Sequence, residues 1–196
     1  MPAHFATTVA GLPGEAEAAQ LPPDLVGGVG DGVPPVLPEV QHEIEVGDLV
    51  VDGLELLGQL ELNWLGNADE RMVVALLADF TDAPAREMPG DAALLRAAEQ
   101  GVRVLNARYG AEDRDPFLLL HRPREWNPAQ GCWMGWERKR GKLEDFNALV
   151  LGLPSRLAVR AGQGARLRGV RFAVTLDADT FLPHDAARRL AGTLAH

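Results

Sequence analysis

Three continuous apolar runs dominate the second half of the chain, and each run ends in polar residues. The runs are MVVALLAD (72–79), FLLLH (117–121) and VRFAVTLD (170–177). An uninterrupted apolar run of this length is typical of a strand that is buried on both faces of a parallel sheet. The pattern therefore predicts three buried strands that end at Asp79, His121 and Asp177.

Segments with helical spacing of apolar residues follow each predicted strand. The first helix is expected from Asp91, which can cap its start, to Gly110, the second from about Glu137 to Leu151, and the last from about Asp185 to Leu194. The order is therefore βαβαβα. With right-handed crossovers, this order predicts an α/β fold with a parallel sheet covered by helices, which is half of a doubly wound nucleotide-binding fold.

The segment before these elements shows neither the helical nor the strand period. Residues 1–47 contain seven of the fourteen prolines together with clustered glycines. Such a segment buries too little apolar surface to offset its chain entropy, so we predict that residues 1–47 are a disordered linker. Residues 48–71 are expected to be a short helical lead-in, weakened by Gly53 and Gly58, and residues 72–196 to hold the α/β fold.

Charge is distributed unevenly along the chain. The whole chain has a formal net charge of −9, which argues against nucleic-acid binding. The stretch from His121 to Lys142 has the opposite balance, because it contains six basic residues and two acidic ones. A local cationic patch on an acidic protein indicates a small anionic ligand, and a solvated helix face is the alternative explanation.

Several classes of protein are disfavoured by the sequence. The longest apolar run, Met72 to Ala78, is far shorter than the roughly 20 residues that cross a bilayer, and the start of the chain lacks the features of a secretory signal. The chain as given is therefore expected to have no membrane span and to be cytoplasmic. The single cysteine, Cys132, cannot form an internal disulfide and is expected to be a small buried residue.

Two carboxylates, those of Asp177 and Asp179, leave the third predicted strand together. Parallel sheets bind ligands outside the carboxyl ends of their strands, where Asp79, His121 and Arg122 are also expected. Mg²⁺ is usually held by one or two carboxylates while a phosphate group supplies further oxygen ligands. We therefore predict that Asp177 and Asp179 hold Mg²⁺ or Mn²⁺ against a nucleotide diphosphate.

Other families use the same Asp-x-Asp triplet. Phosphatases with an aspartate nucleophile place Thr or Val two residues after the second aspartate, whereas this chain has Phe181, so they remain a distant alternative. No glycine-rich dinucleotide or P-loop motif follows any strand. The only serine, Ser155, lies outside a nucleophile elbow, which disfavours a serine hydrolase.

Several longer motifs occur together and in order. They are LLADFTDAP, FLLLHRPREWNP, WMGWERKRGKLEDFN and VTLDADTFLPHDAARRLAGTLAH, and they resemble the transferase domain of the bacterial cyclic β-1,2-glucan synthases from about Met72 to His196. The resemblance implies an incomplete, Rossmann-like GT-A-type fold and glucosyl transfer from UDP-glucose to a β-1,2-glucan with a divalent metal. It also implies a large parent enzyme in the inner membrane whose transferase domain faces the cytoplasm.

The resemblance also implies roles for individual residues. Lys139-Arg140-Gly141 resembles the Lys-x-Gly motif of processive transferases, although Glu144 stands near the place of their usual asparagine and Asn147 comes only later. The implied nucleotide-sugar ligands are Asp79 and Asp82 for the base or ribose, Arg122, Arg124, Arg138, Lys139 and Lys142 for the diphosphate, and Asp177 together with the metal. Surface charge is the alternative explanation for the basic residues.

The remaining expectations concern the tryptophans and the activity. Trp126, Trp133 and Trp136 can stack on sugar rings or fill a core, and we expect two of them in the core. In this fold the catalytic base follows the Asp-x-Asp triplet, so it is expected downstream of His196. The chain by itself is therefore expected to transfer no glucose, and a non-catalytic remnant of the enzyme is the alternative function.

Overall fold

The computed structural model describes residues 4–10, 51–112, 114–178 and 180–195. Five strands form a mixed sheet in the order β6-β3-β2-β1-β7, and β4 (Glu125–Asn127) and β5 (Cys132–Met134) form a separate hairpin. The α/β class is thus as predicted. Among the described residues, no helix combines the length and apolar character that a membrane span requires.

The three apolar runs form the predicted strands. β2 (Val73–Asp79) and β3 (Phe117–Arg122) pair in parallel, and all their residues are buried. β7 (Ala173–Asp177) and β2 each pair antiparallel with β1 (His4–Ala10), so β7 runs in the same direction as β2 and β3. The carboxyl ends of all three predicted strands therefore lie along the same side of the sheet, which we call the carboxyl edge.

The all-parallel sheet is wrong, because two further strands run antiparallel. β1 lies between β2 and β7, so residues 4–10 of the predicted disordered segment 1–47 are a strand. Their β-branched run of Thr, Thr and Val suits a strand. Without β1, the facing backbone groups of β2 and β7 would lack hydrogen-bond partners, and this favours the insertion of β1 between them. Residues 1–3 and 11–47 lie outside the described residues. The second antiparallel strand, β6 (Ala158–Ala161), is the outermost strand of the sheet and pairs with β3. A 3₁₀ helix (Gly164–Leu167) follows β6 in the chain and leads toward β7.

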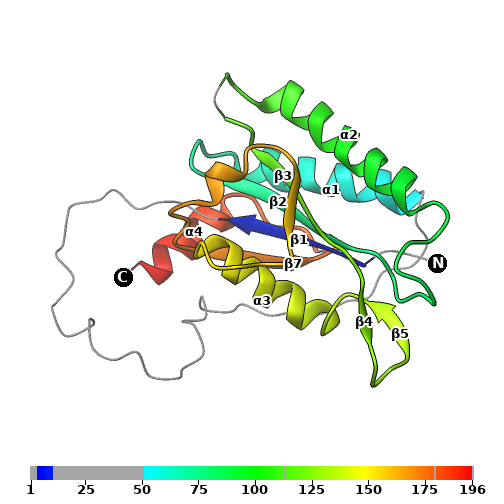
Figure 1. Ribbon diagram of the computed structural model, residues 1–196. Helices are drawn as coiled ribbons and strands as arrows, with labels where there is room; N and C mark the ends of the chain where they lie inside the picture. The colour runs from blue at the N-terminus through cyan, green and yellow to red at the C-terminus, as the bar shows by residue number, and fades with distance from the viewer. Residues whose placement is uncertain (1–3, 11–50, 113, 179, 196) are drawn as a thin grey trace, which may run out of the picture.

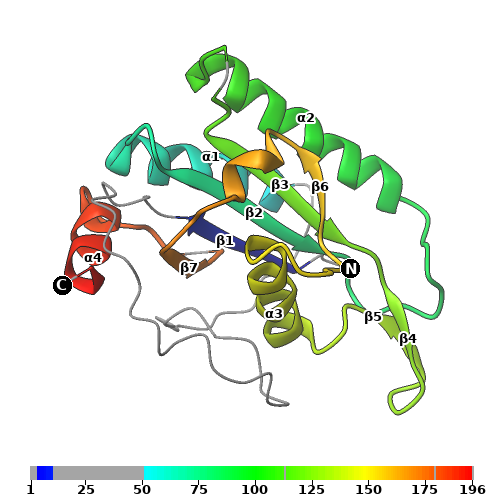
Figure 2. The same ribbon diagram turned by 60° about the vertical axis from the view of Figure 1, so that its left-hand side comes forward.

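Helices cover both faces of the sheet (Figures 1 and 2). Successive residues of β2 alternate between two apolar clusters. One cluster packs under α1 (Val51–Asn67), α2 (Asp91–Tyr109) and α4 (Ala186–Leu194), and the other packs under α3 (Arg138–Val150). This two-sided burial explains why β2 reads as a continuous apolar run.

The helix caps differ from the predicted ones. Asp91 is the first residue of α2, but Gly90 (φ 98°) is its N-cap, and the Asp91 carboxylate accepts a hydrogen bond from the Met88 backbone N–H at 2.8 Å. α4 receives its cap from another helix, because the Ala187 N–H donates to Oδ1 of Asn67 at 3.0 Å. α1 spans 17 residues within the predicted helical lead-in, and its Asn63 side chain likewise accepts a hydrogen bond from the Leu182 N–H at 2.9 Å.

Candidate functional site

The carboxyl ends of β2, β3 and β7 carry Asp79, Arg122 and Asp177, and α3 starts beside them. Asp79 and Arg122 are register partners, and their side chains are 3% and 0% exposed. The Arg122 guanidinium donates from Nε and Nη2 to the two carboxylate oxygens of Asp79, both at 2.9 Å. This bidentate geometry is the strongest arrangement for such a pair. It ties the ends of β2 and β3 together.

Arg122 also connects the sheet to α3. Its remaining donors reach Asp145 Oδ2 at 3.1 Å, the Trp136 carbonyl at 2.8 Å and the Arg138 carbonyl. Burial opposes the charged form of Arg122, but the hydrogen bonds and attraction to Asp79 and Asp145 outweigh burial and raise its pKa. Arg122 therefore stays charged and fixes the segment that begins α3.

Lys142 and Asp145 complete the buried charge network, and Asp145 is not among the residues predicted from the sequence. The ammonium of Lys142 lies 3.5 Å from Asp79 Oδ2, and its burial lowers its pKa more than the attraction to Asp79 raises it. Asp145 also accepts from Arg156 at 3.2 Å. The spacing of Lys142, Asp145 and Phe146 places all three on one helix face, and that spacing could have revealed the inward position of Asp145.

A left-handed turn precedes α3. Glu137 and Arg138 have φ angles of 52° and 44°, values that non-glycine residues seldom adopt. The Lys-x-Gly glycine makes this turn possible, since a Cβ on Gly141 would lie 2.0 Å from the Trp136 carbonyl oxygen. Arg122 donates to carbonyls within the turn. The turn then sets where Lys139 points.

Lys139 reaches across to the end of β7. Its ammonium donates to Oδ1 of Asp177 at 2.7 Å, and the side chains are 35% and 3% exposed. The second oxygen, Oδ2, is buried and has no hydrogen-bond partner among the described residues. A buried carboxylate oxygen without a partner is costly, so Oδ2 is a candidate ligand atom for a cation.

Arg138 and Asp82 form a more exposed pair next to this site. The Arg138 guanidinium donates to Asp82 at 2.7 Å and to the Gln130 side chain at 2.9 Å, and 51% of the Arg138 side chain is exposed. The contacts join the loop after β2, the start of α3 and the hairpin of β4 and β5. Arg138 has the most exposed side chain of the five basic candidate residues, which are Arg122, Arg124, Arg138, Lys139 and Lys142.

Arg124 is engaged in a different set of contacts. It is 3% exposed, donates to Asp91 at 2.5 Å and to the Thr81 and Arg86 carbonyls, and stacks over the Phe80 ring at 4.9 Å. Burial raises the pKa of Asp91, but hydrogen bonds from Arg124 and the Met88 N–H outweigh that effect and leave it lowered. Arg124 thus fixes the loop between β2 and α2.

One of the two predicted metal ligands, Asp177, lies among the described residues. Asp177 presents a buried, unpartnered oxygen, which fits one carboxylate ligand for a hard cation. Asp179 lies outside the described residues. Within residues 4–10, 51–112, 114–178 and 180–195, no group of three or more His, Cys, Asp or Glu side chains has the arrangement of a metal site.

Trp126, Trp133 and Trp136 lie on the hairpin or directly after it rather than in the core. Trp126 and Trp136 are 50% and 36% exposed, and Trp133 is partly buried with its ring 5.9 Å from that of Trp126. Arg156 lies over the Trp136 ring at 4.7 Å. The expectation that two tryptophans fill the core is wrong, because the hairpin is too small to enclose them. Cys132, on the same hairpin, is only partly buried.

Comparison with known proteins gives one informative result. The chain matches no protein-family model. Over 144 residues it is 42% identical to the cyclic beta-(1,2)-glucan synthase NdvB of Rhizobium meliloti (strain 1021). The resemblance to the cyclic β-1,2-glucan synthases is confirmed. The match covers 72% of this chain and 5% of that protein, so the chain spans a small part of its relative's length.

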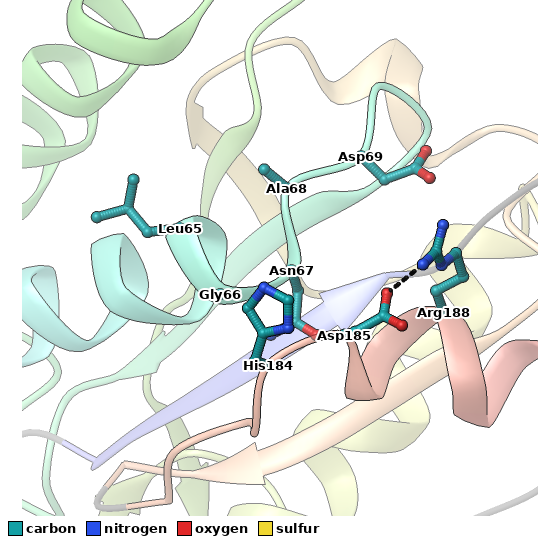
Figure 3. Close-up of a pocket in the computed structure, with 8 residues that line it drawn as sticks. All are labelled: Leu65, Gly66, Asn67, Ala68, Asp69, His184, Asp185 and Arg188. Carbon is teal, nitrogen blue, oxygen red and sulfur yellow. Dashed lines mark ion pairs between the residues drawn. The ribbon is translucent and has the colours of Figure 1, made fainter.

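A pocket among the described residues lies elsewhere, between the end of α1 and the start of α4 (Figure 3). Its volume is about 200 Å³, and its lining includes Asn67, Asp69, His184 and the Asp185–Arg188 ion pair. Ligand pockets usually measure roughly 300 to 1,000 Å³. The pocket is thus small, and it contains none of the residues at the carboxyl ends of the strands. The carboxyl edge remains the candidate site.

Proposed function

We propose that this chain is the donor-binding part of a glycosyltransferase of the cyclic β-1,2-glucan synthase type. In this proposal the sheet is the nucleotide-binding half of a GT-A-type domain, the donor is UDP-glucose and the acceptor is a β-1,2-glucan. The name of the relative, a glucan synthase, supports the reaction class. The common direction of β2, β3 and β7 supports a ligand at their shared carboxyl edge. The parent enzyme is proposed to lie in the inner membrane with this domain on the cytoplasmic side.

The observation that carries the proposal is the state of Asp177. Its carboxylate is buried at the carboxyl edge, one oxygen contacts the Lys139 ammonium, and the other has no partner among the described residues. A divalent ion on that oxygen would neutralise negative charge on a leaving nucleotide diphosphate. Asp177 would hold the Mg²⁺ or Mn²⁺, with Asp179 as its proposed second carboxylate.

The basic residues divide into two groups in this proposal. Arg138 and Lys139 keep exposed surface at the edge, so they bind the diphosphate directly. Arg122, Arg124 and Lys142 are almost wholly buried and engaged with carboxylates, so they position the site rather than contact the phosphates. Asp82, which is partly exposed, is the proposed base or ribose contact, and the buried Asp79 supports that contact through its pairing with Arg122.

Calorimetric titration of the 196-residue chain with UDP tests the proposal. We expect binding in Mn²⁺ or Mg²⁺ and none in a chelator. Asp177→Asn should abolish the metal-dependent binding. Glu144→Gln makes the same chemical change at an exposed carboxylate that pairs with Arg140 on the outer face of α3, and it should bind UDP like the wild type. Equal UDP affinity with and without metal would rule out the metal assignment.

A further inference from the structure

The Lys139 ammonium is the counter-charge of Asp177 in this structure. The two groups are 2.7 Å apart, and Asp177 is 3% exposed. A buried carboxylate is strongly destabilising unless a cation and hydrogen bonds compensate it. Lys139 therefore supplies the compensating positive charge that a bound metal ion would also supply to Asp177.

A second cation on Asp177 would have to bind the carboxylate oxygen that Lys139 does not contact. Lys139 contacts Oδ1, whereas Oδ2 is buried and has no hydrogen-bond partner among the described residues. Mg²⁺ and Mn²⁺ prefer carboxylate oxygens of this kind. Two cations on one carboxylate repel each other, so a divalent ion on Oδ2 weakens the hold of Asp177 on Lys139.

Lys139 is only partly buried, so its ammonium has room to turn away from Asp177. Its side chain is 35% exposed, it stands in the first turn of α3, and Arg138 beside it is 51% exposed. A lysine ammonium on its flexible stem reorients more easily than a guanidinium held in a fork. Once released from Asp177, the ammonium lies next to the exposed edge where a diphosphate would be bound.

We propose that Lys139 is an exchangeable internal cation, which neutralises Asp177 in the ligand-free chain and moves to the diphosphate when a divalent ion occupies Asp177. This inference rests on the proposed donor site. It adds a consequence: metal and nucleotide bind cooperatively, because the metal frees the ammonium that the nucleotide uses. By linkage, the nucleotide must raise the metal affinity by the same factor.

The first test measures two affinities of the full chain. Mn²⁺ affinity without nucleotide is followed by the electron paramagnetic resonance of free Mn²⁺, and UDP affinity of the Mn²⁺-saturated chain by calorimetry. Lys139→Met should bind Mn²⁺ roughly tenfold more tightly and UDP roughly tenfold more weakly, as expected for the loss of one charge-assisted hydrogen bond. Arg140→Met removes the same charge one residue away, where it pairs with Glu144, and should change neither affinity.

The second test uses the wild-type chain, so it does not depend on a variant that folds. The sequence contains two lysines, Lys139 and Lys142. In a chain labelled with ¹³C at lysine Cε, Mg²⁺ should shift the Lys139 signal, and UDP should shift it further. The buried Lys142 serves as the internal reference, and its signal should move little.

The outcomes separate this inference from the proposed function. If the wild type binds UDP in Mn²⁺ but Lys139→Met keeps the wild-type Mn²⁺ affinity, or Arg140→Met matches the change, the exchange is refuted and the donor site stands. A Lys139 signal that Mg²⁺ leaves unmoved also refutes the exchange. If the wild type binds no UDP in Mn²⁺, the proposed function fails, whereas the Mn²⁺ affinities and the Mg²⁺ shift still test the exchange at Asp177.

Discussion

The Arg122 guanidinium and the Asp79 carboxylate form a bidentate ion pair inside the protein, with both hydrogen bonds at 2.9 Å. The pair joins the last residues of two neighbouring strands, and Arg122 extends it to Asp145 on α3 and to the carbonyls of Trp136 and Arg138. One side chain thereby fixes the sheet edge, the left-handed turn and the start of α3. The position of Lys139 depends on this network.

Removal of the Asp79 charge should destabilise the chain strongly. Breaking a buried pair leaves an uncompensated charge, so we expect Asp79→Asn to lower the free energy of unfolding by about 3 to 5 kcal/mol. Urea unfolding followed by circular dichroism measures this change. Arg140→Met, which breaks an exposed pair on α3, should leave the free energy nearly unchanged. Equal effects of the two substitutions would contradict the role of the buried network.

The predictable part of the fold was the part with a strong local pattern. β2 and β3 are buried on both faces, so their apolar runs predicted them almost to the residue. β1 was missed because it joins the sheet through pairing with β2 and β7, which are distant in sequence, and its surroundings are rich in proline and glycine. β6 and the hairpin were missed because their strands are short and largely exposed, so they carry no strong hydrophobic pattern.

The position of the candidate residues at one end of the sheet could be predicted from the sequence. The rule that ligands bind at the carboxyl ends of parallel strands placed Asp79, Arg122 and Asp177 together, and the structure brings them to one edge. The sequence could not show that Arg122 is wholly buried or that Lys139 contacts Asp177, because both depend on how α3 packs on the sheet. Asp145 was missed although its spacing from Lys142 and Phe146 marks it as part of the inward face of α3.

A methyl group on Gly141 should disturb the site. The added Cβ would lie 2.0 Å from the Trp136 carbonyl oxygen, so the left-handed turn must shift and move Lys139 away from Asp177. We expect Gly141→Ala to lower both the thermal midpoint and the affinity for UDP. Gly58→Ala is the matched control in α1, where a Cβ meets nothing within 4 Å. That change should stabilise the chain by up to about 1 kcal/mol. Similar effects of both substitutions would disprove the steric role of Gly141.

His121 should make stability depend on pH. Burial lowers its pKa from 6.5 to about 4, although attraction to Asp79 partly opposes the shift. Between these two values the unfolded chain binds more protons than the folded chain, so the contribution of neutral His121 is complete above pH 6.5 and is lost as the pH falls toward 4. The shift corresponds to about 3 kcal/mol.

The measurement for His121 is urea unfolding from pH 7 to pH 4, with His121→Gln as the reference that does not titrate. Carboxylates titrate in the same window in both proteins, so the difference between the two curves isolates the histidine. Between pH 7 and pH 4, we expect the free energy of unfolding of the wild type to fall by about 3 kcal/mol more than that of the variant. Parallel curves would show that folding does not lower the pKa of His121.

Amide chemical shifts test most directly whether the carboxyl edge of the sheet binds the nucleotide sugar. In a ¹⁵N-labelled chain with Mg²⁺, we expect UDP-glucose to shift the amide signals of Asp82, Arg138, Lys139 and Asp177. The signals of Gly66 and Arg188, at the pocket between α1 and α4, should stay in place. Shifts confined to that pocket, or no shifts at saturating UDP-glucose, would contradict the account.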